Sequence, residues 1–289
     1  MSIPGPLSFA APVARLPYRV AEASPEPGFA PESLWLRPFG FEAEHLKVNF
    51  SQPLRPFLVT DILACCARNG DEGIDQSLLW QLTVGARIEC LILILSCSGI
   101  DSFGVQFRCP SDGCDEESEV EVTVAELTEV QETAHGGDRL TVTSGGETLV
   151  LRRPTGIDQL AWLRSGIRED AGSMLAMART LMVNGGPDGV AQKAAGDWID
   201  LADEAMEDFD PLVNFNMLVR CPFCGEESRC EVDLEEISLR LLRKAQQRLL
   251  RTVHRLASHY HWGEEQIFAV PHWRRAEYLG LINSEIRKK

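Results

Sequence analysis

The chain has 289 residues, 44% of them hydrophobic, which is enough for one large domain or two ordinary ones with a real core. Its 28 basic and 43 acidic side chains give a formal net charge of −15, which argues against a general nucleic-acid-binding protein. The charge is uneven, because residues 235–289 contain 11 basic and 6 acidic side chains and carry a net charge of +5. An acidic body with a basic C-terminal segment predicts a charged partner surface, or docking of this segment on the body.

The nine cysteines and the N-terminal sequence predict a cytoplasmic protein. The N-terminus lacks a basic stretch followed by an apolar run, so no secretory signal is expected, and paired cysteines in a reducing compartment hold metal more often than they form disulfides. The longest apolar stretch, residues 90–95, is too short to cross a bilayer, so no membrane partner is expected. Cys65, Cys66, Cys90 and Cys97 stand in apolar surroundings and are expected to be small core residues.

The first 100 residues are predicted to form an arm followed by helices. Residues 1–30 contain six prolines interleaved with alanine and serine, which predicts an extended or disordered arm that is not part of the core. Apolar residues at helical spacing predict a helix at 54–67 and one or two helices at 75–95.

Two hairpins are predicted on either side of a long insertion, each with a cysteine pair at its tip. Apolar and polar residues alternate on both sides of each pair, as in antiparallel strands. The strand-like runs are residues 105–107, 120–124, 216–219 and 228–232.

The insertion is predicted to contain a third hairpin and several helices. Residues 141–151 form a hairpin pattern with Gly145-Gly146 at the turn, and a helix is expected to begin after Pro154. Two further helical patterns follow at 171–183 and 191–207, and the sequence Asn-Gly-Gly-Pro separates them.

The C-terminal segment is predicted to be helical throughout. A long amphipathic helix begins near Leu234, with apolar residues three or four apart, and Trp262-Gly263 ends it. A short turn or helix is expected at 264–269 and a final helix at 273–286.

The two hairpin tips, here called knuckles, share the sequence Arg-Cys-Pro followed by a second cysteine. Four thiolates from two such loops form a tetrahedral zinc site. We therefore predict zinc bound by Cys109 and Cys114 of the first knuckle and by Cys221 and Cys224 of the second. The metal would join parts of the chain that 106 intervening residues separate. A closed four-sulfur shell leaves no position for water, so the predicted zinc is structural.

Residues around the cysteines fit a metal-binding turn. Pro222 pre-sets the backbone after Cys221, and Gly225 suits a left-handed conformation, as does Gly113 in the longer first knuckle. Arg108 and Arg220 precede the first cysteine of each pair and are expected to offset the negative charge of a four-thiolate centre.

Two other functions stay open for the second cysteine pair and the basic helix. The Cys-x-x-Cys spacing of Cys221 and Cys224 also occurs in thioredoxin-like enzymes, although there it opens a helix after a buried parallel strand, whereas turn and strand residues follow here. The basic residues at 240–255 are either a nucleic-acid surface of a zinc ribbon or a solvated helix face. No phosphate loop, nucleophile elbow or catalytic carboxylate pair is recognisable, so neither enzyme activity nor a small-molecule substrate is expected.

Several segments in chain order carry a resemblance to a known family. They are Trp35-Leu36-Arg37-Pro38, Leu82-Thr83-Val84-Gly85, the first knuckle, residues 151–156, Asp210-Pro211, Leu218-Val219-Arg220-Cys221-Pro222-Phe223-Cys224-Gly225, residues 250–257, His259-Tyr260-His261-Trp262, residues 266–271, Arg274-Arg275 and Tyr278-Leu279. This order resembles proteins encoded with contractile tails, namely phage baseplate proteins and their relatives in extracellular contractile injection systems. The resemblance covers roughly residues 30–286 and is most specific at the double knuckle and the His-Tyr-His-Trp segment.

The resemblance implies a non-enzymatic protein that builds or completes a tail baseplate. Its partners would be other baseplate or tail proteins, and its place would be the cytoplasm or an assembled phage-tail-like particle. The expected fold is α+β, with a zinc ribbon made of two strand–knuckle–strand hairpins, helical insertions and a C-terminal helical segment. The expected parts are an arm at 1–30, a body at 31–233 and a basic helical segment at 234–289. Trp262, Trp273 and Tyr278 are expected to anchor that segment, within the chain or on a partner.

Overall fold

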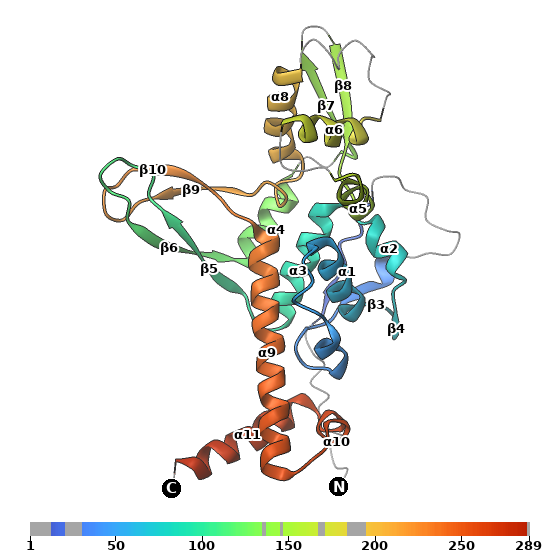
Figure 1. Ribbon diagram of the computed structural model, residues 1–289, viewed down its shortest axis with the longest axis vertical. Coiled ribbons are helices and arrows are strands. Elements are labelled where there is room, and N and C mark those ends of the chain that lie inside the picture. Colours follow the sequence, from blue (N-terminus) through green and yellow to red (C-terminus); the bar gives the residue numbers. More distant parts are fainter. Residues whose placement is uncertain are drawn as a thin grey trace, which may run out of the picture.

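The computed structural model describes residues 13–20, 31–134, 137–144, 147–166, 171–183 and 195–287. Within these ranges helices combine with small antiparallel sheets, which confirms the predicted α+β class. A helical body carries an arm of two hairpins on one side and a small lobe at the top, and a long helix runs down to a C-terminal helical segment (Figure 1). No described helix is both long and apolar enough to cross a membrane.

Three helices form the centre of the body and confirm the helices expected in this part of the sequence. They are α1 (Arg55–Cys66), α2 (Gln76–Gln81) and α3 (Val84–Cys97). The side chains of Asp75 and Thr83 accept backbone N–H groups at the starts of α2 and α3, so polar caps fix both starts. Helix α3 is buried along most of its length, which explains its nearly continuous apolar sequence.

A small sheet at the edge of the body corrects one expectation about the N-terminus. The antiparallel sheet has the order β1 (Ala14–Arg15), β2 (Leu34–Leu36), β3 (Ala67–Asn69) and β4 (Glu72–Gly73), and a 3-10 helix (Pro31–Ser33) precedes β2. Leu16, next to β1, is 4% exposed and belongs to the main core. The prediction that residues 1–30 contribute nothing to the core was therefore wrong for 13–20, because strand pairing brings Leu16 inward. The rest of the predicted arm lies outside the described residues.

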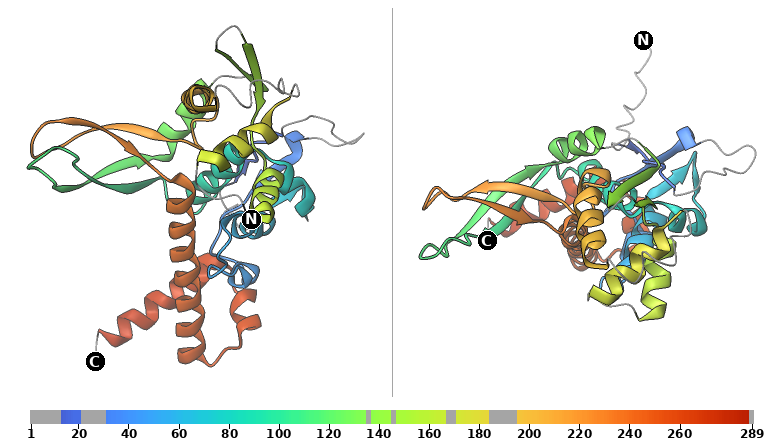
Figure 2. Two further views of the ribbon diagram at one scale, coloured as in Figure 1. Left: turned by 45° about the horizontal axis from the view of Figure 1, so that its top comes forward. Right: turned by 90° about the horizontal axis from the view of Figure 1, so that it is seen from above.

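The double-hairpin arm is formed by the strands that the sequence predicted around the two knuckles. Its strands are β5 (Ser102–Arg108), β6 (Glu117–Thr123), β9 (Asn216–Arg220) and β10 (Glu227–Glu231), paired antiparallel as β5–β6 and β9–β10. Both hairpins leave the body side by side and meet again at their tips (Figures 1 and 2). The knuckles therefore lie at the far end of the arm.

The second strand of the first hairpin ends earlier than the alternating pattern predicted. Val124 begins α4 (Val124–Thr133) instead of continuing β6. The Thr123 hydroxyl accepts the N–H of Glu126 at 3.2 Å, and the Glu126 carboxylate accepts the N–H of Thr123 at 2.8 Å. This capping box begins the helix and so ends the strand, and its Thr-x-x-Glu pattern is present in the sequence.

The lobe is the insertion between the two hairpins. It contains β7 (Arg139–Ser144), β8 (Glu147–Arg152), α6 (Ala171–Leu181) and α8 (Ala195–Phe209), while α5 (Gly156–Ser165) lies between the lobe and the body. Val142, Leu149 and Leu181 belong to a separate apolar cluster within the lobe. The predicted turn at 145–146, the predicted break at 184–187 and the start of the helix predicted from 191 lie outside the described residues.

Helix α9 (Leu234–Tyr260) ties the parts together and confirms the predicted long helix. Leu234 packs at the base of the arm, Leu242 in the main core and Leu256 in a cluster with the C-terminal helices. Those helices are α10 (Glu264–Ala269) and α11 (His272–Ile286), both close to their predicted ranges.

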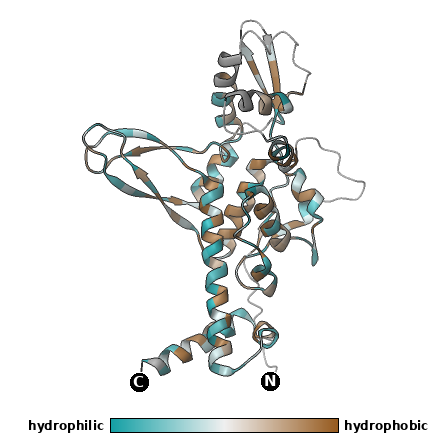
Figure 3. Ribbon diagram, viewed as in Figure 1, coloured by the Kyte–Doolittle hydropathy of each residue, from teal (hydrophilic) through white to brown (hydrophobic). Residues whose placement is uncertain are grey.

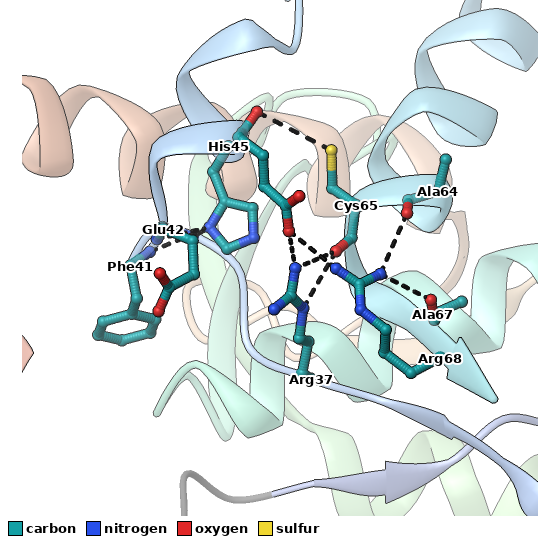
Figure 4. A network of polar contacts seen from close by, with 10 residues as sticks. Arg37, Phe41, Glu42, His45, Ala64, Cys65, Ala67 and Arg68 are labelled. Carbon is teal, nitrogen blue, oxygen red and sulfur yellow. Dashed lines mark hydrogen bonds and ion pairs between the residues drawn. The ribbon is translucent and has the colours of Figure 1, made fainter. Parts of the chain in front are cut away.

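A buried histidine fixes the loop that precedes α1. His45, in a 3-10 helix (Ala43–Lys47), is fully buried, and its Nδ1 accepts the backbone N–H groups of Gly40, Phe41 and Glu42 at 3.0–3.1 Å (Figure 4). Three donors aimed at one nitrogen require a neutral ring. Burial, with a contribution from Arg37, lowers the pKa of His45 to about 3.

The same loop is tied to both neighbouring helices. Arg37 and Arg68 both pair with Glu44, and Arg37 also donates to the carbonyl of Cys65 at 3.0 Å (Figure 4). On the other side, the amide of Gln246 donates to the carbonyls of His45 and Val48. These contacts hold the loop between α1 and α9.

Candidate metal centre

The arm brings the four predicted cysteine ligands together at its tip. Their Sγ atoms all lie within 4.8 Å of one another. The short distances join the two hairpins, with 3.6 Å between Cys109 and Cys224 and 3.7 Å between Cys114 and Cys221. Tetrahedral zinc with bonds of ~2.3 Å to sulfur places its ligands ~3.8 Å apart, so these sulfurs have the spacing that one such ion needs. A disulfide would need ~2.05 Å, and all nine cysteines are free.

Both knuckles close with the same backbone hydrogen bond despite their different lengths. The N–H of Cys109 donates to the carbonyl of Glu116 at 3.0 Å, and the N–H of Cys221 donates to the carbonyl of Glu226 at 2.9 Å. In each case the acceptor lies two residues after the second cysteine. The looser first knuckle therefore presents its sulfurs from the same kind of turn as the tight second one.

The two extra residues of the first knuckle are accommodated by left-handed backbone. Gly113 has a φ of 82° and Asp115 a φ of 48°, and the N–H of Cys114 donates to the carbonyl of Ser111 at 3.0 Å. In the second knuckle Gly225 has a φ of 79° and donates its N–H to the carbonyl of Cys221 at 2.9 Å. The predicted turn roles of Gly113 and Gly225 are confirmed.

Backbone donors favour the thiolate of Cys221. The N–H of Cys224, together with that of Phe223, lowers the pKa of Cys221 to about 7 against the opposing effect of burial. At Cys114 the N–H of Glu116 also favours the thiolate, but burial and the sulfurs of the other three cysteines outweigh it and raise the pKa to about 12. Four thiolates so close together repel one another, and a central divalent cation removes that repulsion.

The two arginines have different partners, and only Arg108 departs from its predicted role of offsetting the charge of the sulfurs. The guanidinium of Arg108 pairs with Asp115 at 3.2 Å and with Glu117 at 2.6 Å, and the Nε of Arg220 donates to the carbonyl of Gly225 at 3.2 Å. Arg108 therefore pairs with side chains beside its own knuckle, whereas Arg220 braces the backbone of the second knuckle. Arg108 in particular has its charge balanced by carboxylates instead of by sulfur.

The first cysteine of each knuckle is buried and the second is more open. Cys109 and Cys221 are 2% and 1% exposed, whereas Cys114 is half-buried and Cys224 is exposed. The apolar cluster of the arm lies near its base, where Phe103 and Val122 pack against α3, Leu212 and Val232. Two-stranded hairpins have little stability of their own, so the tips need a further link between them.

The remaining cysteines lie outside this cluster. Cys66, Cys90 and Cys97 are buried and Cys65 is half-buried against the core, as predicted. Burial raises the pKa of Cys90 to about 12, so it remains a thiol. Cys230 is half-buried on β10, and its Sγ lies 3.7 Å from the carbonyl of Glu231.

The three predicted aromatic anchors have two different environments. The ring of Trp262 stacks on Tyr260 at 4.8 Å and meets Tyr278 edge-on at 5.2 Å, so two of the anchors hold α11 to the end of α9. Trp273 is 55% exposed.

A cavity that sequence patterns do not reveal lies between the His45 loop, α9 and α11. Its volume is about 230 Å³, and Phe39, Leu249 and Arg275 are among its lining residues. Segments more than 200 positions apart in the chain form it, so no local pattern predicts it.

The second cysteine pair lies in a turn between the antiparallel strands β9 and β10. A redox Cys-x-x-Cys pair opens a helix instead, so this geometry argues against the oxidoreductase alternative. Comparisons of the chain with protein-family models, with curated proteins and with solved structures found no match.

Proposed function

We propose that the chain is a non-enzymatic structural or assembly protein in which one zinc ion fastens the double-hairpin arm. We further propose that it acts through protein–protein contacts in the baseplate of a contractile tail or injection system. The single observation that carries the first statement is the cluster of four sulfurs within 4.8 Å at the tip of the arm. Among the described residues, no other group of three or more such side chains could hold a metal ion.

Zinc fits the donor set and the surroundings. Four cysteine sulfurs at near-tetrahedral spacing are typical of structural zinc, and a complete sulfur shell leaves no open position for catalysis. The contribution of such a site to folding is on the order of 10 kcal/mol. The ion would join the tips of the two hairpins and so hold the arm together. Because the lobe is the chain segment between these hairpins, the same ion would also fix the two ends of that segment relative to each other.

The contractile-tail context rests on the sequence resemblance alone. The shape of the molecule is compatible with a scaffold, because an arm and a lobe project from one body and offer separate surfaces (Figure 1). The net charge of −15 also suits oriented docking on neighbouring proteins more than contact with nucleic acid.

Elemental analysis tests the metal. Purified protein should contain about one zinc per chain, and Cys109→Ser or Cys221→Ser should lose it. Cys230→Ser is the matched control, because it removes a thiol from the same arm outside the cluster. Iron in place of zinc, or disulfide reductase activity that disappears with Cys221→Ser, would refute a structural zinc site and favour a redox function.

The tail context has a separate test. Genes for sheath, tube and spike proteins beside the gene for this chain are expected, and its deletion should stop complete particles from forming, as seen by electron microscopy. Normal particles after the deletion would refute the assembly role, and the proposal of a zinc site would be unaffected.

A further inference from the structure

One side of α9 carries a row of cations. Arg240, Lys244, Arg248, Arg251 and Arg255 follow one another at intervals of four, four, three and four residues, which places them on one face of the helix. We call this row the basic stripe; it is ~22 Å long at 1.5 Å per residue. Its first four members are exposed and Arg255 is half-buried. In Figure 3, hydrophilic and hydrophobic residues alternate along α9, as in an amphipathic helix.

The basic stripe is not neutralised by the part of the chain that the structure describes. None of its five members has an ion pair there, and Arg255 donates to the neutral amide of Asn283 at 2.6 Å. The chain as a whole is negative, with 43 acidic side chains, whereas the surface along this row is positive. Such a surface attracts an anionic partner.

The cavity of about 230 Å³ opens beside the middle of the basic stripe, since Arg248 lines it. Phe39, Leu249 and Leu279 supply apolar wall, while His272 and Arg275 add polar groups from α11. The volume is below the 300–1,000 Å³ or so of pockets for whole small-molecule ligands and suits one or two side chains.

Arg275 gives the cavity a fixed cation. It is 4% exposed, its guanidinium donates to the carbonyl of Phe41 at 2.7 Å, and its Cζ lies 5.0 Å from the centre of the Phe268 ring. Its buried Nε has no hydrogen-bond partner among the described residues. Because the His45 hydrogen bonds hold the Phe41 backbone in place, the guanidinium is held before any partner arrives.

We propose that the basic stripe and this cavity form a docking surface for an acidic segment of a partner protein. Carboxylates of the segment pair with the stripe, and an apolar side chain next to one of them enters the cavity between Arg248 and Arg275. The inference rests on the proposed scaffold function, to which it adds the surface and the chemistry of the partner.

The observations favour an acidic protein over the other two anionic occupants. The apolar wall of the cavity suits a side chain better than the phosphate of a nucleic acid. A second copy offers the acidic first hairpin, where Asp115 and Glu117 are paired with Arg108. Glu116 and Glu119 of the same hairpin have no ion pair among the described residues. That hairpin is two-stranded and carries at its tip, all of which the structure describes, no large apolar side chain that is free to enter the cavity, and self-association is measured separately below.

Fluorescence anisotropy on the full, zinc-loaded chain tests the surface. The probe is a labelled peptide of about 15 residues, the length of the stripe as a helix, built from repeats of Glu-Glu-Leu-Glu. Arg248→Glu should weaken binding by about tenfold or more. Arg243→Glu is the matched control, because it reverses an exposed charge on the same helix but off the stripe, and it should change binding by less than about twofold.

The cavity has its own variant. Ala276 lines the cavity at an exposed position of α11, so Ala276→Leu should partly fill the cavity. This variant should weaken binding of the leucine-containing peptide but not binding of a peptide with alanine in place of leucine. Absence of peptide binding, equal losses with both charge reversals, tighter binding of duplex DNA, or self-association abolished by Arg248→Glu would each overturn the inference. Because zinc content and particle assembly are measured separately, these results are distinguishable from a failure of the proposed function.

Discussion

The Sγ of Cys109 lies 3.6 Å from the Sγ of Cys224, although 115 positions separate the two residues in the chain. This contact crosses from the first hairpin to the second, and the contact between Cys114 and Cys221 does the same. A metal at this place therefore joins two hairpins, and each hairpin supplies half of its ligands.

Removal of the metal should loosen the arm before the body. A strong chelator is expected to speed amide hydrogen exchange in β5, β6, β9 and β10, because the tips have little apolar contact to replace the ion, whereas α3 keeps its buried core contacts. Exchange measured by mass spectrometry with and without chelator checks this. Unchanged exchange in the arm, with zinc shown to be absent, would mean that the hairpins hold together without it.

Gly225→Ala should weaken the metal site through the backbone. The glycine has a φ of 79°, where a side chain costs about 1–2 kcal/mol, while a Cβ there meets nothing closer than the guanidinium of Arg220 at 4.0 Å. Zinc affinity, measured by competition with a chromophoric chelator, should fall by roughly tenfold. Gly73→Ala is the control, because Gly73 also has open space around its Cβ position but no left-handed φ. Equal affinities in all three proteins would contradict the role assigned to Gly225.

Asp210 should make the protein less stable as the pH rises from about 4 to about 6. Its carboxyl accepts the N–H of Gly85 at the start of α3, but burial outweighs this bond and the nearby Arg153 and Arg19 and raises its pKa from 3.8 to about 6. The folded state therefore holds a proton that the unfolded state has lost, and its ionisation costs about 3 kcal/mol across this window.

The comparison with Asp210→Asn isolates this effect. The variant keeps an oxygen for the N–H of Gly85 and does not titrate, so the difference in unfolding free energy between the two proteins should change with pH in that window. Denaturant unfolding at several pH values measures it. A constant difference would show that folding does not raise the pKa of Asp210.

His45 should act in the opposite direction and make the protein sensitive to acid. Its pKa falls from 6.5 to about 3 on folding, so the unfolded state binds a proton that the folded state rejects, and stability is lost as the pH drops through this range. The full loss is about 5 kcal/mol.

His45→Asn tests this assignment, since the Asn oxygen can take the place of Nδ1 as an acceptor without titrating. The variant is expected to be less stable than the parent protein at neutral pH and to lose less stability in acid. A parallel loss in both proteins would assign the acid sensitivity to other groups.

Local patterns of residue type and spacing predict much of the fold. The spacing of apolar residues places α1 and α9 close to their observed ends, because each helix has a continuous buried side. It also predicts helix at 75–95, but it does not locate the break between α2 and α3. The repeated Arg-Cys-Pro sequence identifies all four sulfurs of the cluster. The exception is Val124, where alternation predicted strand but the capping box of Thr123 and Glu126 began α4, since paired hydrogen bonds at a helix start outweigh one more apolar residue in register.

Other features depended on contacts between distant segments. The pairing of β1 with β2 places Leu16 in the core, although the sequence around it predicted a free arm. The charge of Arg108 is balanced by the carboxylates of Asp115 and Glu117, although the sequence predicted that it would offset the sulfurs. The cavity beside Arg248 likewise needs the His45 loop, α9 and α11 in one place.

By itself, the sequence determined the identity of the four sulfurs, the helices and the basic character of α9, because residue type and spacing act locally. Only the tertiary structure decided which sulfurs lie opposite one another, which arginines remain unpaired and where an apolar wall meets them. These depend on the packing of segments far apart in the chain, such as Phe41 and Arg275 at a separation of 234 positions, and no local pattern encodes such a distance.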